Sequence, residues 1–196
     1  MKNLLIIGAS LCACAAQANL LVNGSFEDTA VANNTYQNVV AGSSFITGWS
    51  VTGTSVDVIA GPTTWIPQAG NQSIDLAGTP GPGAVSQIFA TSVGQEYEVV
   101  FYLGSNHQGS GNKTVDVTID GVTENLIGGL TNGSWVQFVR NFTATNTSTE
   151  IKFESTNSGN FGGAVDNVSV EAVPEPMTMI GLATAALLAA NRKRKK

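Results

Sequence analysis

Thr114–Asp120 reads TVDVTID, and Thr149–Ser155 reads TEIKFES. In both stretches apolar and polar residues alternate, so every second side chain can face a core while its neighbours face water. This period of two residues is typical of a half-buried β-strand, whereas an amphipathic helix repeats every 3.6 residues. The two stretches therefore predict a sheet with one buried face.

Further β-branched and aromatic runs lie on both sides of these two stretches. Turn-forming segments separate them, such as GTPGPG (78–83) and TNSGNFGG (156–163). About nine short strands at this spacing predict an all-β fold, an antiparallel β-sandwich or jelly roll. The predicted strands are Ser44–Val51, Val56–Ile59, Ser73–Leu76, Val85–Ala90, Tyr97–Leu103, Thr114–Ile119, Trp135–Phe142, Glu150–Glu154 and Ala164–Val170.

The start of the chain is typical of an exported protein. Lys2 is followed by a mainly apolar run, and Ala16-Gln17-Ala18 fits the A-x-A pattern of a signal-peptidase site. Residues 1–18 are therefore predicted to be a signal peptide cleaved after Ala18. A lipoprotein alternative stays open, because LCAC (11–14) faintly resembles a lipoprotein box with Cys14 as the lipidated residue.

The two cysteines of the chain, Cys12 and Cys14, both lie inside this predicted signal peptide. The exported domain would therefore contain no disulfide, although exported proteins often rely on them. The same observation excludes thiol catalysis and cysteine-bound metals from that domain.

The chain ends in Val173-Pro174-Glu175-Pro176, an apolar stretch at 177–190, and five basic residues at 192–196. The apolar stretch is shorter than the roughly 20 residues with which a helix crosses a bilayer. A basic cluster of this kind stays on the cytoplasmic side of a membrane. Two interpretations remain open: a weak transmembrane anchor, or a sorting signal that is held in the membrane briefly and then cut.

This ending resembles the PEP-CTERM sorting signal of Gram-negative bacteria, with Pro174, Glu175 and Pro176 as its motif. The resemblance implies that residues 173–196 are a sorting signal, made of Pro-Glu-Pro, a short hydrophobic helix and a basic tail. It implies transient membrane insertion through this helix, followed by cleavage by an exosortase. It further implies export through the inner membrane to the cell surface or extracellular matrix. Bacteria with such proteins often form biofilms and make exopolysaccharide.

Residues 19–172 are predicted to form one β-sandwich domain with a strongly acidic balance. Between the two signals, three strong cations (Lys113, Arg140 and Lys152) stand against thirteen carboxylates, a net charge of −10 compared with −5 for the whole chain. This charge argues against nucleic acid and anionic membranes as partners and favours divalent cations.

Several segments of this domain resemble one family. They are LLVNGSFE (20–27), GNQSIDLAG (70–78), AVSQIFATSVGQEYEVVFYLGSN (84–106), FTATNTSTEIKFES (142–155) and AVDNVSV (164–170). Together they resemble the choice-of-anchor C domains, which are galactose-binding-like β-sandwiches related to carbohydrate-binding modules. The resemblance covers nearly all of Leu20 to Val170 and implies a sugar-binding role.

In galactose-binding-like sandwiches a calcium ion commonly joins the first and last strands. The resemblance implies that Glu27 and Asp166 are calcium ligands, together with carbonyl groups of residues 23–25. Calcium takes six to eight oxygen ligands, which suits this set. The alternative is that both carboxylates only accept hydrogen bonds from backbone N–H groups.

If the domain binds a sugar, aromatic side chains should stack on the pyranose ring while polar groups take its hydroxyls. Trp65 is the first candidate, because it lies in the loop AGPTTWIPQAGN (60–71), although it could equally cover one end of the sandwich. Tyr36 and His107 are loop candidates, and Asp75 could accept a sugar hydroxyl or only local hydrogen bonds. Two further tryptophans sit in strand-like runs and are predicted to be core: Trp49 and Trp135.

Catalysis is not expected, because His107 is the single histidine and neither a G-x-S-x-G elbow nor an H-E-x-x-H zinc motif is present. A carbohydrate (exopolysaccharide) binder would line a groove with exposed aromatics, including Trp65. A structural surface or biofilm protein would bury Trp65 and have no pocket with convergent polar groups. A glycan-active enzyme would need closely placed carboxylates in a cleft, for example involving Asp75 or Asp57.

Overall fold

The structure, a computed structural model, describes residues 18–61 and 65–174. The predicted signal peptide and sorting signal, apart from Ala18, Val173 and Pro174, lie outside the described residues. No helix in the described ranges is long and apolar enough to cross a membrane. Asn19–Ala172 forms one compact unit with eleven strands in its described part.

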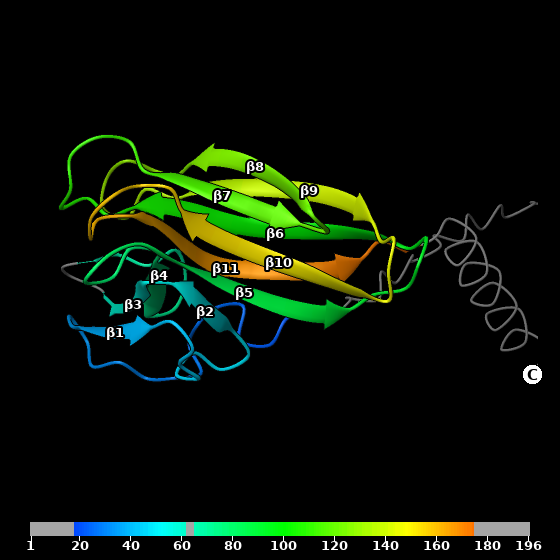
Figure 1. Cartoon of the computed structure of the whole chain (residues 1–196), viewed down its shortest axis with the longest axis horizontal. Coiled ribbons are helices and arrows are strands. Elements are labelled where there is room, and N and C mark those ends of the chain that lie inside the picture. Colours follow the sequence, from blue (N-terminus) through cyan, green and yellow to red (C-terminus); the bar gives the residue numbers. More distant parts are fainter. Residues whose placement is uncertain (1–17, 62–64, 175–196) are drawn as a thin grey trace, which may run out of the picture. The chain divides into compact units, whose positions relative to one another are not determined.

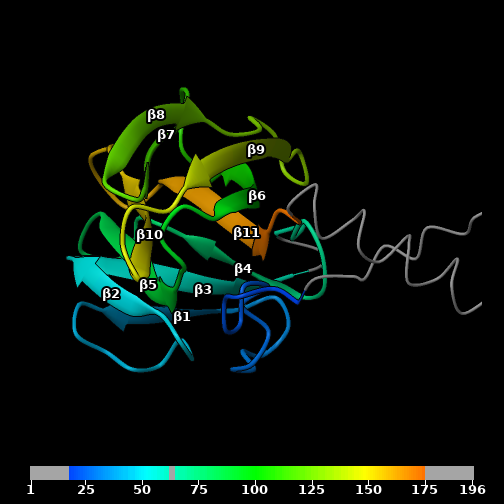
Figure 2. The same cartoon turned by 90° about the vertical axis from the view of Figure 1, so that its right-hand side faces the viewer.

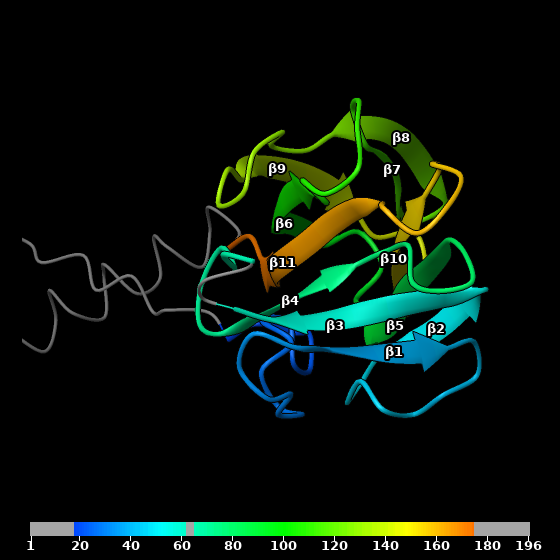
Figure 3. The ribbon, with the colours of Figure 1, turned by 90° about the vertical axis from the view of Figure 1, so that its left-hand side faces the viewer.

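Six strands form the first sheet, in the order β1-β3-β4-β11-β6-β9, with every pair antiparallel (Figure 1). Figure 3 shows β1, β3, β4 and β11 of this sheet side by side. The strands are β1 (Tyr36–Val40), β3 (Ser55–Ala60), β4 (Gln72–Asp75), β6 (Glu96–Ser105), β9 (Val136–Thr143) and β11 (Gly163–Ala172).

Five strands form the second sheet, in the order β2-β5-β10-β7-β8, again antiparallel throughout. Figure 2 shows the two sheets as layers that face each other. The strands are β2 (Ser50–Gly53), β5 (Gly83–Ala90), β7 (Thr114–Ile119), β8 (Val122–Ile127) and β10 (Ser148–Ser155). The all-β antiparallel sandwich predicted from the sequence is confirmed.

The core lies between the sheets and is built from alternate residues of each strand. Val58, Ile74, Val165 and Leu103 stand opposite one another across the first sheet and are buried. Phe101 and Phe153 meet edge to face across the layers, with ring centroids 5.2 Å apart. This packing between sheets replaces the disulfides that the domain lacks.

The N-terminal segment runs beside the last strand. The Leu20 N–H donates to the Val170 carbonyl at 2.9 Å, and the Val168 N–H donates to the Gly24 carbonyl at 2.8 Å. Phe26 and Trp49 pack their rings 5.1 Å apart in the core beneath this segment. The two ends of the domain are therefore held together by backbone hydrogen bonds.

Some of the strand predictions are wrong. β1 and β8 were not predicted, because both are edge strands whose exposure pattern does not alternate. Of the strand predicted at Ser44–Val51, only Ser50 and Val51 are in β2. Trp49 is buried in the core as expected, but Trp135 is only half-buried. The ring of Trp135 packs over Gly104, on the face of the first sheet that points away from the core.

Candidate functional site

A pocket of about 380 Å³ lies on the outer face of the first sheet. Residues directly opposite in antiparallel strands share a face, so Asp57 and Asp75 lie together on the side away from buried Val58 and Ile74. Loops before β1 and β11 and after β3 and β6 close over this face. We call it the aromatic–amide pocket; it is lined by Asn34, Thr35, Tyr36, Asp57, Ile59, Trp65, Thr79, Asn106, Gln108, Asn160 and Phe161.

Two aromatic side chains of this pocket are open to solvent. Tyr36, at the start of β1, is 63% exposed, and Phe161, in the loop before β11, is 43% exposed. Both rings can therefore present a face to a ligand. Tyr36 was predicted as a ligand contact, and the structure places it in the pocket wall.

Trp65 also lines the pocket, but it is not the exposed platform expected from its loop position. It is only 5% exposed, and its indole N–H donates to the Ser73 hydroxyl on β4 at 2.6 Å. The His107 ring lies against it, with the ring centroids 5.7 Å apart. The expectation of an exposed Trp65 is wrong because its indole lies against Ser73 of β4 and beside the His107 ring. His107 is exposed and packs on Trp65 without lining the pocket itself.

Asp75 lies behind the pocket and positions its wall. The side chain has no exposed surface and accepts hydrogen bonds from the Asn106 amide (2.6 Å) and the N–H groups of Ala77 (2.9 Å) and Gly162 (3.2 Å). It therefore fixes the Asn106 amide, which lines the pocket, and the backbone of Gly162 directly after Phe161. Burial raises the pKa of Asp75 to about 7, although these hydrogen bonds oppose the rise.

Asp57 is the carboxylate that lines the pocket. Its Oδ1 accepts a hydrogen bond from the Asn38 amide at 2.7 Å, and the residue is 8% exposed. Burial also raises the pKa of this carboxyl above its ordinary range. Neither lysine nor arginine is among the described residues that line the pocket. The pocket thus combines two exposed aromatic rings, several amides and one carboxylate.

The two predicted calcium ligands hold one loop. Glu27 Oε1 accepts the N–H groups of Asn71 (2.8 Å) and Gln72 (2.7 Å), and Asp166 Oδ2 accepts those of Gln68 (2.9 Å) and Ala69 (3.2 Å). These are the backbone hydrogen bonds of the alternative interpretation. Burial, and in addition the charge of Glu27, raise the pKa of Asp166 to about 7. The two carboxylates are therefore close enough to repel each other.

The oxygen atoms around this pair only partly fit calcium. Glu27 and Asp166 provide the hard carboxylate oxygens that calcium prefers. The Asn23 carbonyl, however, already accepts the Trp49 indole N–H at 3.0 Å, and the Gly24 carbonyl accepts a backbone N–H. In residues 18–61 and 65–174 no cluster of three or more His, Cys, Asp or Glu side chains could hold a metal ion. A calcium site here would depend on two carboxylates and on carbonyl groups.

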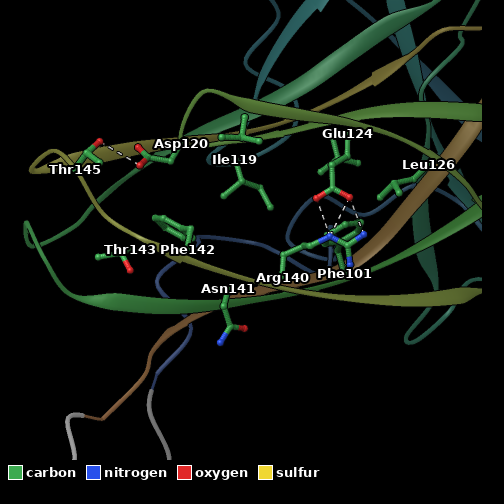
Figure 4. Close-up of a pocket in the computed structure, with 12 residues that line it drawn as sticks. Phe101, Ile119, Asp120, Glu124, Leu126, Arg140, Asn141, Phe142, Thr143 and Thr145 are labelled. Carbon is green, nitrogen blue, oxygen red and sulfur yellow. Dashed lines mark hydrogen bonds and ion pairs between the residues drawn. The ribbon is translucent and has the colours of Figure 1, made fainter.

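A second pocket, also of about 380 Å³, opens between the edge strands β8 and β9 (Figure 4). Its inner wall is apolar and includes Phe101, Ile119 and Leu126. The figure shows Glu124 pointing across the opening at Arg140, whose Nε and Nη2 donate to the carboxylate at 2.8 Å. This exposed ion pair links the two sheets. None of the ligand contacts or metal ligands predicted from the sequence lines this second pocket.

Sequence reasoning missed the amides and one aromatic ring of the aromatic–amide pocket. The residues that it missed are Asn34, Asn106, Gln108, Asn160 and Phe161. Asn106 and Gln108 flank His107 in its loop, SNHQGSGN (105–112), and Asn160 and Phe161 lie in the turn-forming segment TNSGNFGG (156–163). An aromatic residue inside a Gly/Asn loop, as at Phe161, is the signal that could have identified it.

Comparison with known protein families identifies the family of this chain. A model described as "Protein of unknown function (DUF642)" matches residues 19–171. The chain belongs to this DUF642 family. The match spans the compact unit with both sheets and the aromatic–amide pocket.

The chain is also similar to a named protein. It is 33% identical over 171 residues to Halomucin of Haloquadratum walsbyi. The alignment covers 83% of this chain and 2% of Halomucin. The chain therefore spans about one fiftieth of the length of that relative.

Solved structures similar to the DUF642 domain include three carbohydrate-binding modules. One is a family 16 carbohydrate binding module (16% identity, 78% of this chain, 99% of the other, TM-score 0.46). Another is the CBM22-1 xylan-binding domain from Paenibacillus barcinonensis (16% identity, 74% of this chain, 99% of the other, TM-score 0.46). A third is a family 35 module from Clostridium thermocellum (12% identity, 68% of this chain, 97% of the other, TM-score 0.45). Similarity at this level carries no argument about what the chain binds.

Proposed function

We propose that this DUF642 domain binds carbohydrate without catalysis, and that the aromatic–amide pocket is its binding site. The observation that carries the proposal is the pairing of exposed Tyr36 and Phe161 with convergent amides in one pocket. Aromatic faces stack on the C–H faces of pyranose rings, while amides donate to and accept from hydroxyls. A pocket of this volume is within the range of small-ligand sites.

A purely structural surface protein fits only half of the observations. Such a protein is expected to bury Trp65, which is the case, but also to have no pocket with convergent polar groups. The aromatic–amide pocket does not fit this second expectation. Carbohydrate binding is therefore the better-supported function. The alternative is a structural protein that acts at the cell surface through its bulk and charge.

A glycan-active enzyme has a specific difficulty in this pocket. Asp57 and Asp75 stand directly opposite each other on β3 and β4, as a carboxylate pair would require. Hydrolysis needs both carboxylates to reach opposite sides of the scissile bond. Asp75 has no exposed surface and its carboxylate is held by three donors. The pair is therefore better suited to shaping a binding site than to cleaving a bond.

The proposal is tested with purified Asn19–Val173 on an array of glycans and polysaccharides, with Tyr36→Ala and Phe161→Ala beside the unaltered sequence. Ile88→Ala is the matched control, because Ile88 is 70% exposed on β5 of the other sheet. Specific binding that both aromatic variants weaken at least tenfold, and the control does not, is the expected result. An absence of binding to every glycan would favour the structural alternative.

We further propose that the protein is exported and sorted to the cell surface or matrix, where exopolysaccharide would be its partner. The A-x-A site ending at Ala18 and the ending from Pro174 onward support this proposal. Mass spectrometry of the protein from cells with and without their exosortase would test it. The expected result is a chain that begins at Asn19 and ends near Pro-Glu-Pro only when the exosortase is present.

Calcium bound between Glu27 and Asp166 is a separate proposal. The ion would neutralise two carboxylates that repel each other, and so join the N-terminal segment to β11 and to the loop of residues 66–72. The melting temperature of Asn19–Val173 should then be higher in calcium than in EGTA, and Glu27→Gln should remove the difference. An unchanged melting temperature would exclude a stabilising calcium ion.

A further inference from the structure

We propose that the aromatic–amide pocket selects uncharged glycans and rejects those that carry carboxylates at the bound residue. This inference rests on the proposed carbohydrate-binding function and names the class of ligand. It follows from the charges around the pocket and from the kind of hydrogen-bonding groups that line it.

None of the described residues that line the pocket carries a positive charge with which to bind a uronic acid. The carboxylate of a uronic acid is matched by the guanidinium of arginine or the ammonium of lysine, which donate charge-assisted hydrogen bonds to it. The lining residues include none of these side chains.

Each cation of the described domain is engaged elsewhere. Arg140 pairs with Glu124 at the edge of the sandwich, and Lys152 pairs with Glu154 on β10. Lys113 comes closest, since its ammonium and the Phe161 Cβ both lie within 3.0 Å of the place where a Cβ on Gly109 would stand. It is 7% exposed, and its ammonium donates to the Ser110 carbonyl at 2.7 Å. Lys113 is not among the described residues that line the pocket, and its burial keeps the ammonium from direct contact with a bound carboxylate.

The pocket instead carries negative charge. Asp57 lines it, and Asp75 stands directly opposite on the neighbouring strand, on the same face of the sheet. A ligand carboxylate about 4–6 Å from Asp57 would meet a repulsion that lowers its affinity roughly a hundredfold or more at the effective dielectric of a protein surface. A hydroxyl at the same place would donate a charge-assisted hydrogen bond to Asp57.

The other polar groups suit hydroxyls in the same way. The amides of Asn34, Asn106, Gln108 and Asn160 and the phenol of Tyr36 can both donate and accept, as sugar hydroxyls do. Two interactions therefore favour an uncharged sugar ring. The polar groups bind its hydroxyls, and Asp57 repels the carboxylate of the corresponding uronic acid.

The test compares polymers that differ only in charge. Binding of Asn19–Val173 is measured at about pH 8, above the pKa of about 7 of buried Asp75. The ligands are a galactan and a polygalacturonate, and a glucan and a polyglucuronate. The expected result is binding to at least one neutral polymer and roughly a hundredfold weaker binding to its acidic partner. Equal or tighter binding of the acidic polymer, weakened by Tyr36→Ala, would overturn this inference and leave the carbohydrate-binding function standing. Binding to none of the broader set of glycans would instead overturn that function itself.

Asp57→Asn tests the cause of the selectivity, because the amide keeps the shape and removes the charge. It should raise the affinity for the acidic polymer at least tenfold relative to the neutral one. The matched control is Asp28→Asn, which removes one charge at an exposed position outside the pocket. Equal selectivity in Asp57→Asn, in a variant that melts as the unaltered domain does, would refute the role of Asp57.

Salt provides a second test that needs no variant. Raising NaCl from about 0.01 M to about 1 M shortens the Debye length from about 30 Å to about 3 Å. Repulsion between Asp57 and an acidic polymer should weaken accordingly, so the affinity gap between the paired polymers should narrow. A gap that does not change with salt would count against charge as its cause.

Discussion

Asp75→Asn should change how the stability of the domain depends on pH. Asp75 is fully buried on β4, and burial raises the pKa of its carboxyl from the ordinary 3.8 to about 7. Between these two pH values the folded domain therefore holds a proton that the unfolded chain has lost. The stability that this proton contributes is complete below about pH 4 and is lost as the pH rises through about 7.

The rise in pKa sets the size of the effect. A change from 3.8 to about 7 corresponds to about 4 kcal/mol of unfolding free energy. Asparagine does not titrate and offers one acceptor oxygen to the three N–H donors around it, so Asp75→Asn adds a loss that does not vary with pH. The unaltered domain should thus exceed the variant in stability by more at about pH 4 than at about pH 8, by up to about 4 kcal/mol.

Urea unfolding of both proteins, followed by tryptophan fluorescence across this pH range, measures the difference directly. The pKa values of Asp57 and Asp166 are also raised, but both residues remain in the two proteins, so subtraction largely removes their contributions. Asp28→Asn, at an exposed carboxylate, provides the control for the loss of one charge. A difference in stability that is constant from about pH 4 to about pH 8 would show that the three donors keep Asp75 ionised, and the reasoning from burial would be wrong.

Three further changes test the packing. Gly70→Ala should destabilise the domain more than Gly42→Ala: both glycines have positive φ, which costs an alanine about 1–2 kcal/mol, but only at Gly70 would the new Cβ lie 2.5 Å from a Glu27 carboxylate oxygen. Equal losses in urea unfolding would contradict a tight approach of Glu27 to this loop. Glu124→Gln should lower the unfolding free energy by less than about 1 kcal/mol, because the ion pair that it breaks is exposed; a larger loss would mean that the pair holds the sheets together. Trp49→Ala should lower it by about 3–5 kcal/mol, since Trp49 is 3% exposed within the aromatic core, and a loss below about 1 kcal/mol would contradict that position.

Central strands could be predicted from the sequence, but the edge strand β8 could not. TVDVTID and TEIKFES became β7 and β10, which pair with each other and bury the apolar side chains of their alternating pattern. β8 (VTENLI) lies at the edge of the same sheet and exposes most of its side chains, apolar ones included. Its sequence therefore lacks the alternation that burial imposes. Only the pairing of β8 with β7 shows that it is a strand.

For the candidate site, too, the sequence predicted single residues, and only the structure shows how they are arranged. The sequence named Tyr36, Trp65, Asp75 and His107 one by one, from aromatic or acidic side chains in or near loops. The structure places Tyr36 and Trp65 in the lining of one pocket, Tyr36 open to solvent and Trp65 buried. The other two do not line it: His107 packs on Trp65, and Asp75 lies behind the wall and binds Asn106. Exposure and neighbours of this kind depend on how loops fold back on a sheet, which no local pattern encodes.

The sequence by itself determined that the domain is an antiparallel β-sandwich without disulfides, because strand periodicity, turn residues and cysteine positions are local properties of the chain. It also determined the acidic balance and the two terminal motifs on which the proposal of export depends. The tertiary structure alone decided that Asp57 and Asp75 face each other, that Trp65 is buried, and that Phe161 and the loop amides complete a pocket. These facts arise from strand register and loop packing between residues far apart in the chain, which are set by the folding of the whole domain.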